Sequence, residues 1–178
     1  MKVKFIKEIF PVIFITLVVF VSVALLSGTD SITKDRIEYQ KELKIQNMLT
    51  EMFPNMGEYT FEDEIYTIYS DGVIEGFAFL ATGKGYGGKI DILVGLENEN
   101  TIKGITIITQ GETPGLGSRV TESSFTGGFA GITIDGVALK KDGGQVDALT
   151  GATISSQAVA EAVRTTALEK VKSLKERE

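Results

Sequence analysis

The stretch IDILVGLENENTIKGITIIT, residues 90–109, consists of two apolar runs separated by a short polar segment. The runs Ile90–Leu96 and Thr101–Thr109 are rich in β-branched residues, which favour strands. Between them, Glu97–Asn100 supplies the acidic and amide side chains that are typical of turns. Two such runs joined by a short turn predict an antiparallel β-hairpin.

The sequence just upstream has the same pattern. Ile65–Tyr69 and Val73–Ala81 flank the turn Ser70-Asp71-Gly72 and predict a second hairpin. Strand patterning extends from Tyr59 to Ile134 without a helical segment between the runs, which disfavours a doubly wound parallel sheet. We therefore expect an antiparallel sheet.

Helical patterns lie on both sides of this strand region. Apolar residues recur at helical spacing from Ser31 to Phe53, where Pro54 ends the pattern, and again from about Ser155 to Lys175. The predicted fold class is α+β: one N-terminal transmembrane helix followed by an antiparallel-sheet domain with flanking helices.

The transmembrane prediction rests on Ile9–Leu26, eighteen residues without a charge. As a helix this run is about 27 Å long, close to the thickness of the bilayer hydrocarbon. Lysines before the run place the N-terminus in the cytoplasm by the positive-inside rule. A cleaved signal peptide is the alternative, but the run is longer than a usual signal-peptide core and lacks a small-x-small cleavage site. The predicted organisation is a signal anchor over 1–28, a membrane-proximal helix over 29–57 and an extracytoplasmic domain over 58–178.

The composition excludes several kinds of chemistry. The 178 residues include no cysteine and no histidine, so disulfides, thiolate nucleophiles, histidine-based triads and cysteine-ligated metal centres are absent. Carboxylates, hydroxyls, lysines and a bound cofactor remain available for chemistry, and we predict no metal site and no catalytic residue in this chain. A net charge of −6 repels phosphate backbones and disfavours nucleic-acid binding.

Glycine is concentrated in three clusters, of which the first is Gly83–Gly88. Its spacing matches GxGxxG, but a strand follows it where a dinucleotide-binding motif requires a helix. It is no P-loop either, because no GxxxxGK[ST] string is present. Two interpretations stay open at this point: a plain tight turn, and a loop that lines a ligand site.

The second cluster, Gly111–Gly117, directly follows the hairpin predicted over residues 90–109. Pro114-Gly115 suits the central positions of a type II turn, in which glycine supplies the positive φ. Glycines on both sides of Leu116 would let backbone amides and one apolar side chain approach a flat ligand.

The third cluster, Asp147–Ser156, places four hydroxyl side chains around the start of the C-terminal helix. Helix N-termini carry free N–H groups and partial positive charge, so this segment can bind phosphate. A simple N-cap with additional hydroxyls explains the pattern equally well. Without histidine to activate it, a hydrolytic serine or threonine is disfavoured.

Together these motifs resemble a known family. The strings GETPGLGSRV and DALTGATISSQAV, with YGGKI upstream, are similar to the FMN-binding domain of the G subunit of Rnf-type electron-transport complexes, which the C subunit of the sodium-translocating NADH:quinone oxidoreductase shares. The resemblance implies that FMN is joined by a phosphoester to Thr153, the last residue of the D-x-x-[ST]-G-A-T motif. It also implies a flavin transferase that uses FAD and magnesium. Ala148 departs mildly from the pattern, because this position is often glycine in the family.

The resemblance implies a membrane-anchored flavoprotein that relays electrons on the outer side of the membrane. Its partners would be the integral-membrane and redox subunits of a complex that couples ferredoxin and NAD electron transfer to Na+ or H+ translocation. A membrane-tethered flavin-binding or sensory module outside any complex is the alternative, and a surface hydrolase is a third class. The predicted cofactor-binding residues are Thr153, Thr150, Gly151, Ala152, Ser155, Ser156, Glu112, Thr113, Gly115, Leu116, Gly117, Tyr86 and Gly87.

Overall fold

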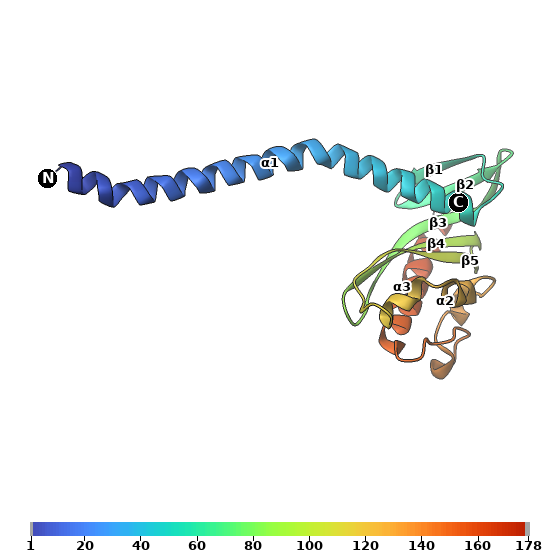
Figure 1. The fold of residues 1–178 in the computed structure, drawn as a ribbon. Helices are drawn as coiled ribbons and strands as arrows, with labels where there is room; N and C mark the ends of the chain where they lie inside the picture. Colours follow the sequence, from blue (N-terminus) through green and yellow to red (C-terminus); the bar gives the residue numbers. More distant parts are fainter. Residues whose placement is uncertain (1, 177–178) are drawn as a thin grey trace. The chain divides into compact units, whose positions relative to one another are not determined.

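The computed structural model describes the backbone of residues 2–176, and the side chains of residues 10, 12–27, 33, 34, 36, 37 and 39–176. The chain divides into two compact units, of which the first ends at Ile45 and the second begins at Gln46. The helices are α1 (Lys2–Met52), α2 (Ser123–Thr126) and α3 (Thr153–Lys175), and the strands are β1 (Glu58–Glu62), β2 (Ile65–Ser70), β3 (Val73–Lys84), β4 (Lys89–Asn98) and β5 (Thr101–Gln110) (Figure 1).

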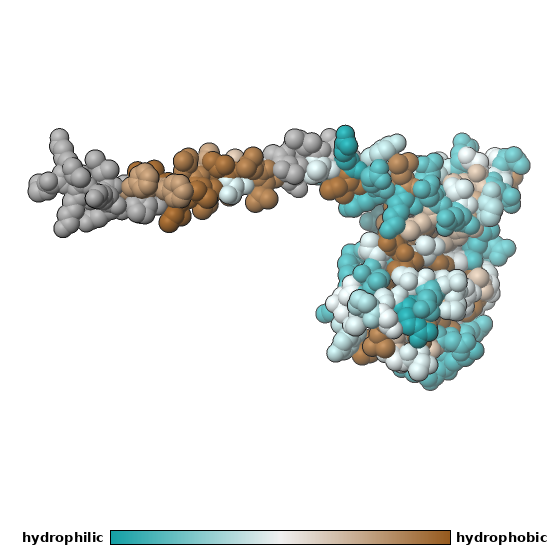
Figure 2. Space-filling view, in the orientation of Figure 1, coloured by the Kyte–Doolittle hydropathy of each residue, from teal (hydrophilic) through white to brown (hydrophobic). Residues whose placement is uncertain are grey.

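A single helix, α1, covers both N-terminal stretches for which separate helices are predicted. It continues through Gly28, because a glycine inside a helix costs only about 1 kcal/mol relative to alanine and does not by itself end the helix. It ends at Met52, just before Pro54, as expected. In Figure 2 apolar side chains cover the described part of the N-terminal half of this helix, where Phe10 and the large apolar residues from Val12 to Leu26 are exposed.

Among the residues that the structure describes, no helix has both the length and the apolar character needed to cross a membrane. The predicted span Ile9–Leu26 includes Ile9 and Pro11, whose side chains lie outside the described set.

The strands form one antiparallel sheet in the order β1-β2-β3-β4-β5, so that each strand pairs with its neighbour in the chain. Both predicted hairpins are present, and the α+β class with an antiparallel sheet is confirmed. In the β2–β3 turn Asp71 and Gly72 have φ values of 50° and 77°, the left-handed backbone that this tight turn requires. Sequence patterning missed β1 as a separate strand because its five residues are all exposed and show no apolar alternation toward a core.

After β5 the prediction of strands as far as Ile134 is wrong. Residues 111–152 instead form α2 and four short 3-10 helices, because the frequent glycines and hydroxyl side chains of this segment favour tight turns over extended runs. It stays attached to the sheet edge by backbone bonds, including Ile102 N–H to the Ile132 carbonyl oxygen at 2.9 Å. The 3-10 helices are Gly117–Thr121, Gly127–Phe129, Ile134–Gly136 and Lys140–Asp142.

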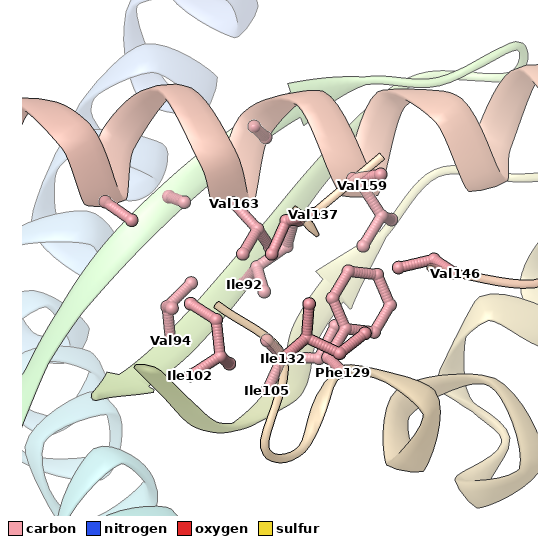
Figure 3. Packing of buried hydrophobic residues seen from close by; sticks show 14 of the residues in the cluster. Ile92, Val94, Ile102, Ile105, Phe129, Ile132, Val137, Val146, Val159 and Val163 are labelled. Carbon is pink, nitrogen blue, oxygen red and sulfur yellow. The ribbon is translucent and has the colours of Figure 1, made fainter. Parts of the chain in front are cut away.

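The main core lies between the sheet, α3 and this irregular segment. Figure 3 shows valines of α3 facing isoleucines of β4 and β5, with Phe129 and Ile132 of the irregular segment closing the same cluster. Val159, Val163 and Phe129 are fully buried, and each such side chain contributes about 1.5–3 kcal/mol. At Gly83 the strand β3 approaches α3 so closely that a Cβ atom would lie 2.6 Å from the Ala158 carbonyl oxygen. This packing fixes the position of the α3 N-terminus relative to the sheet.

The last turns of α1 belong to the second unit and pack on the sheet. Leu49 and Phe53 are fully buried there. Their approach depends on glycine, since a Cβ atom on Gly76 or Gly95 would collide with the Phe53 ring or the Met52 side chain. Lys103 on β5 lies with its Nζ 4.9 Å from the centre of the Phe53 ring.

Candidate functional site

Three segments that are far apart in the sequence meet at one end of the second unit and enclose a cavity of about 430 Å³. The segments are the β3–β4 turn, the loop after β5 and the start of α3. The cavity is lined by Tyr86, Glu112, Thr113, Leu116, Gly117, Gly151, Ala152, Thr153, Ile154 and Ser155.

The β3–β4 turn is both a tight turn and a wall of the cavity. Gly85 N–H donates to the Gly88 carbonyl oxygen at 2.9 Å, which closes the hairpin. The Tyr86 side chain is 76% exposed at the cavity rim. The two interpretations of the first glycine cluster are therefore compatible.

The loop after β5 contains the turn predicted at Pro114-Gly115. Leu116 N–H donates to the Thr113 carbonyl oxygen at 3.2 Å, and Gly115 has a φ of 76°. Ser118 Oγ accepts a 2.9 Å hydrogen bond from Gly115 N–H and fixes the turn from outside. As a result Leu116, which is 47% exposed, stands at the cavity edge.

Glu112 connects all three segments. Its Oε1 accepts hydrogen bonds from Gly87 N–H at 2.9 Å and Gly88 N–H at 3.3 Å, and its Oε2 accepts one from Ser155 Oγ at 2.5 Å. Burial opposes ionisation of this carboxyl, but the bonds from Ser155 and from backbone N–H groups outweigh it and hold its pKa below the ordinary value. Glu112 is therefore an ionised, buried carboxylate at neutral pH.

Glycines surround this carboxylate. A Cβ atom on Gly85 would overlap Glu112 Oε1, and one on Gly117 would overlap Glu112 Oε2 and approach Ser155 Oγ. A Cβ atom on Gly87 would meet the backbone of residues 111 and 112. These glycines make room for a buried side chain and for close backbone contact. Gly117 also lines the cavity beside Leu116, and the approach of a flat ligand at these residues stays a prediction.

Thr153 is the first residue of α3 and its side chain is exposed to the cavity. Among the described residues no side chain caps this helix, and the residue before it is Ala152. The N–H groups of a first helical turn have no acceptor within the helix and carry partial positive charge. The start of α3 thus combines an accessible hydroxyl with uncapped donors suited to an anion.

Two serines of the same turn have other roles. Ser155 is 2% exposed and donates to Glu112. Ser156 is fully buried, where its Oγ donates to the Ala152 carbonyl oxygen at 2.9 Å and accepts from Leu149 N–H at 3.0 Å. The structure therefore places Ser156 inside the fold, where it stabilises the approach to the helix and does not line the cavity.

The remaining predicted site residues divide into two groups. Gly87 contacts Glu112 through its N–H, while Gly115 and Thr150 are exposed residues of the neighbouring loops and do not line the cavity. Sequence reasoning missed Ile154, which lines the cavity and is 57% exposed. The sequence did contain a signal for this residue. Ile154 directly follows Thr153 and lies before the apolar stripe of the C-terminal helix, so this stripe does not account for it.

The cavity combines two chemical characters. Leu116, Ile154 and Tyr86 offer apolar and aromatic surface, and the first turn of α3 offers N–H donors. A volume of about 430 Å³ lies in the usual range for small-molecule sites. The arrangement suits a molecule with a flat apolar part and an anionic end.

Comparisons with known proteins agree with this chemistry. Residues 85–167 match the family model of the FMN-binding domain. The G subunit of the ion-translocating oxidoreductase complex of Methanosarcina acetivorans is 33% identical over 173 residues, covering 88% of this chain and 92% of that protein. The corresponding G subunit of Aliivibrio fischeri is 31% identical over 170 residues, covering 79% and 80%.

Solved structures share the fold. The C subunit of the Na+-translocating NADH–quinone reductase of Parabacteroides distasonis superposes with a TM-score of 0.51 at 28% identity, over 60% of this chain and 61% of that one. NqrC of Shewanella oneidensis superposes with a TM-score of 0.50 at 22% identity, over 68% and 74%, which shows the fold alone. With the motif segments gathered around one cavity, these similarities show that the chain belongs to the family of G subunits of ion-translocating oxidoreductase complexes and carries an FMN-binding domain.

Proposed function

We propose that this chain is the electron-transfer flavoprotein subunit of an ion-translocating oxidoreductase complex, with FMN attached covalently to Thr153. The observation that carries the proposal is the position of Thr153. It is the exposed first residue of α3, a helix that no side chain of the described residues caps, and it lines the cavity formed by the motif segments. A phosphoester at this hydroxyl places the phosphate beside the first-turn N–H groups of α3, which stabilise its charge.

The attachment is a group transfer from FAD by a flavin transferase with magnesium. Thr153 Oγ1 forms a new bond to the phosphorus of the FMN half, the pyrophosphate bond breaks, and AMP leaves. The threonine proton is released to the transferase or to water. The chain itself supplies the nucleophile and its orientation and needs no histidine, which the sequence lacks.

The cavity residues then bind and orient the flavin ring. Leu116 and Ile154 offer apolar surface from two sides of the site, and the phenol ring of Tyr86 offers an aromatic face at the rim. Bound FMN supplies reversible uptake of electrons, and the protein sets its orientation and electrostatic surroundings.

Membrane anchoring belongs to the same proposal. It is supported by the uncharged run Ile9–Leu26, by lysines before it, and by the exposure of its described large apolar side chains. In this proposal the N-terminus is cytoplasmic and the domain over 58–178 is extracytoplasmic. Residues of the transmembrane segment and of the helical segment over 31–53 contact the membrane-embedded partners. The complex would couple electron transfer between ferredoxin and NAD to translocation of Na+ or H+.

Flavin fluorescence in a denaturing gel tests the covalent bond. Co-expression with a flavin transferase should give a fluorescent band at the mass of this chain, and Thr153→Ala should remove it. Thr165→Ala, an exposed threonine farther along α3, is the matched control and should keep the band. Fluorescence that persists in Thr153→Ala would exclude Thr153 as the attachment residue.

Mass spectrometry locates the bond independently. Trypsin cleaves after Lys141 and Arg164, and the peptide between these sites contains Thr153. This peptide should carry one FMN minus one water, with fragment ions that place the added mass on Thr153 and not on Thr150.

Purification separates a component of a larger complex from a lone flavin-binding module. The chain extracted in mild detergent from its native membranes should copurify with integral-membrane redox subunits. Isolation of the fluorescent chain alone, under conditions that keep other membrane complexes intact, would favour the sensory or binding module.

A further inference from the structure

The Glu112 carboxylate accepts three hydrogen bonds from other parts of the protein. Both of its oxygens accept bonds, from Ser155 on one side and from Gly87 and Gly88 on the other. Gln110 Oε1 in turn accepts the Glu112 N–H at 2.6 Å, which fixes the backbone of the residue. Because both its carboxylate and its backbone N–H are hydrogen-bonded, Glu112 joins the β3–β4 turn, the loop after β5 and the start of α3.

We propose that Glu112 is a positioning residue for cofactor attachment: its carboxylate holds the first turn of α3 against the two glycine loops and thereby directs Thr153 into the cavity. This inference rests on the proposed function of Thr153 and goes beyond it, because it assigns the orientation of the attachment residue to a different side chain.

Helix geometry connects the two residues. Successive residues of an α-helix are rotated by about 100°, so residues two apart lie about 200° apart around the axis. Ser155, which is buried and bonded to Glu112, therefore fixes the inner side of the first turn. Thr153 is exposed and lines the same cavity to which Ser155 contributes, so that fixing Ser155 also fixes the direction of the Thr153 side chain.

The segment before α3 cannot fix this turn alone. It reaches Thr153 through exposed Thr150 and Gly151, whose φ is 80°, and through Ala152, which provides no side-chain cap. Besides Ser156, the Glu112–Ser155 bond is the side-chain hydrogen bond that holds the first turn of α3 in the described part of the chain. Its loss leaves Ser156, which bonds to Leu149 and Ala152 of the preceding segment, as the side chain that holds this turn.

Direct contact between Glu112 and the cofactor phosphate is the competing explanation. It is disfavoured because a carboxylate repels a phosphate, and because both Glu112 oxygens already have partners. Glu112 does line the cavity, so its charge is nevertheless part of the surroundings of a bound flavin.

The test compares rates of flavin attachment to the full-length apoprotein with flavin transferase, FAD and magnesium. Ser155→Ala removes the donor and Glu112→Ala removes the acceptor, and we expect each to lower the maximal attachment rate by about 10- to 100-fold, as expected for a misplaced nucleophile. Glu112→Gln can still accept from the glycine amides and donate to Ser155, so it should recover most of the rate.

Two controls separate positioning from loss of stability. Val171→Ala removes a buried methyl pair at the far end of α3 and should leave the maximal rate unchanged at temperatures well below its unfolding midpoint. Glu161→Gln removes an exposed charge of the same helix and should also have no effect.

Two readouts do not depend on turnover. In the apoprotein, amide hydrogen exchange at Gly87 and Gly88 should be about 10-fold or more faster in Glu112→Ala. In loaded protein, Glu112→Gln should have a higher flavin midpoint potential, since a nearby negative charge opposes electron uptake. An unchanged potential would contradict the placement of the Glu112 charge in the surroundings of the bound flavin.

The outcomes distinguish the positioning role of Glu112 from the attachment of flavin to Thr153. If Ser155→Ala and Glu112→Ala attach flavin at the rate of the unmodified protein while Thr153→Ala attaches none, the role of Glu112 is overturned and that of Thr153 stands. If Val171→Ala attaches flavin as slowly as Glu112→Ala does, the stability of the domain sets the attachment rate and the positioning role of Glu112 is overturned. If the unmodified protein attaches no flavin, both proposals fail.

Discussion

Ser155 Oγ donates a 2.5 Å hydrogen bond to Glu112 Oε2, which joins two residues that are 43 positions apart in the chain. The bond crosses from the loop after β5 to the first turn of α3. Charge-assisted hydrogen bonds of this length are among the stronger ones in proteins. Because both residues are buried, removing either leaves a polar group without its partner.

The ionised Glu112 carboxylate makes stability depend on pH. Its pKa in the folded protein lies below the ordinary value of 4.5, so its contribution is present above about pH 4.5 and is lost as pH falls through the folded pKa. We expect Glu112→Gln to lower the free energy of unfolding by about 1–3 kcal/mol at pH 7.

The difference between Glu112→Gln and the unmodified protein should shrink at acidic pH, because both side chains are then neutral. Urea unfolding at intervals from pH 7 to pH 3 measures this. A difference that stays constant down to pH 3 would contradict the assignment of an ionised Glu112.

Gly117→Ala tests the space around the carboxylate. The added methyl group would overlap Glu112 Oε2 and approach Ser155 Oγ, so we expect a loss of about 1–3 kcal/mol in stability from overpacking. Gly127→Ala is the matched control, because no atom of a described neighbouring residue lies within 4 Å of its added methyl group. Thermal unfolding of both variants should show a lower midpoint for Gly117→Ala alone.

Gly76→Ala tests how the end of α1 packs on the sheet. Its methyl group would lie 2.7 Å from the Phe53 ring and collide with the Leu96 carbonyl oxygen. We expect a destabilisation of about 1–3 kcal/mol. Gly104→Ala on β5 meets open space and should change stability by less than about 0.5 kcal/mol. Equal midpoints of chemical unfolding for the two variants would argue against this packing.

Phe129→Ala tests the core that supports the site. Phe129 is fully buried and its ring centre lies 5.4 Å from that of Phe125, so truncation should cost about 3–5 kcal/mol. Phe61→Ala removes a ring that is 55% exposed and contacts Tyr66, and it should cost less than about 1.5 kcal/mol. Calorimetry on the full-length chain can rank the two variants.

The parts of the fold that sequence could predict are those with local patterns. The β-branched runs on both sides of Ser70–Gly72 indicated one hairpin, and apolar spacing indicated α3 to within two residues of its start. The irregular segment after β5 could not be predicted, because its burial depends on contacts with β4 and α3 that no local pattern records.

The same limit applies to the site. The motifs indicated which loops meet, and the pattern around Pro114-Gly115 predicted a turn that the structure contains. The different roles of Ser155 and Ser156 were not predictable, since both are serines of one helical turn and only the tertiary fold turns one toward Glu112 and the other toward Ala152.

The sequential strand order has a kinetic consequence for the site. Each strand pairs with its chain neighbour, so the sheet can form hairpin by hairpin from contacts that are close in sequence, which favours fast folding. The cavity, in contrast, requires α3 to dock on β3 across a long stretch of chain. We therefore expect the start of α3 to be completed last, so that an enzyme acting on Thr153 meets a domain that has already folded.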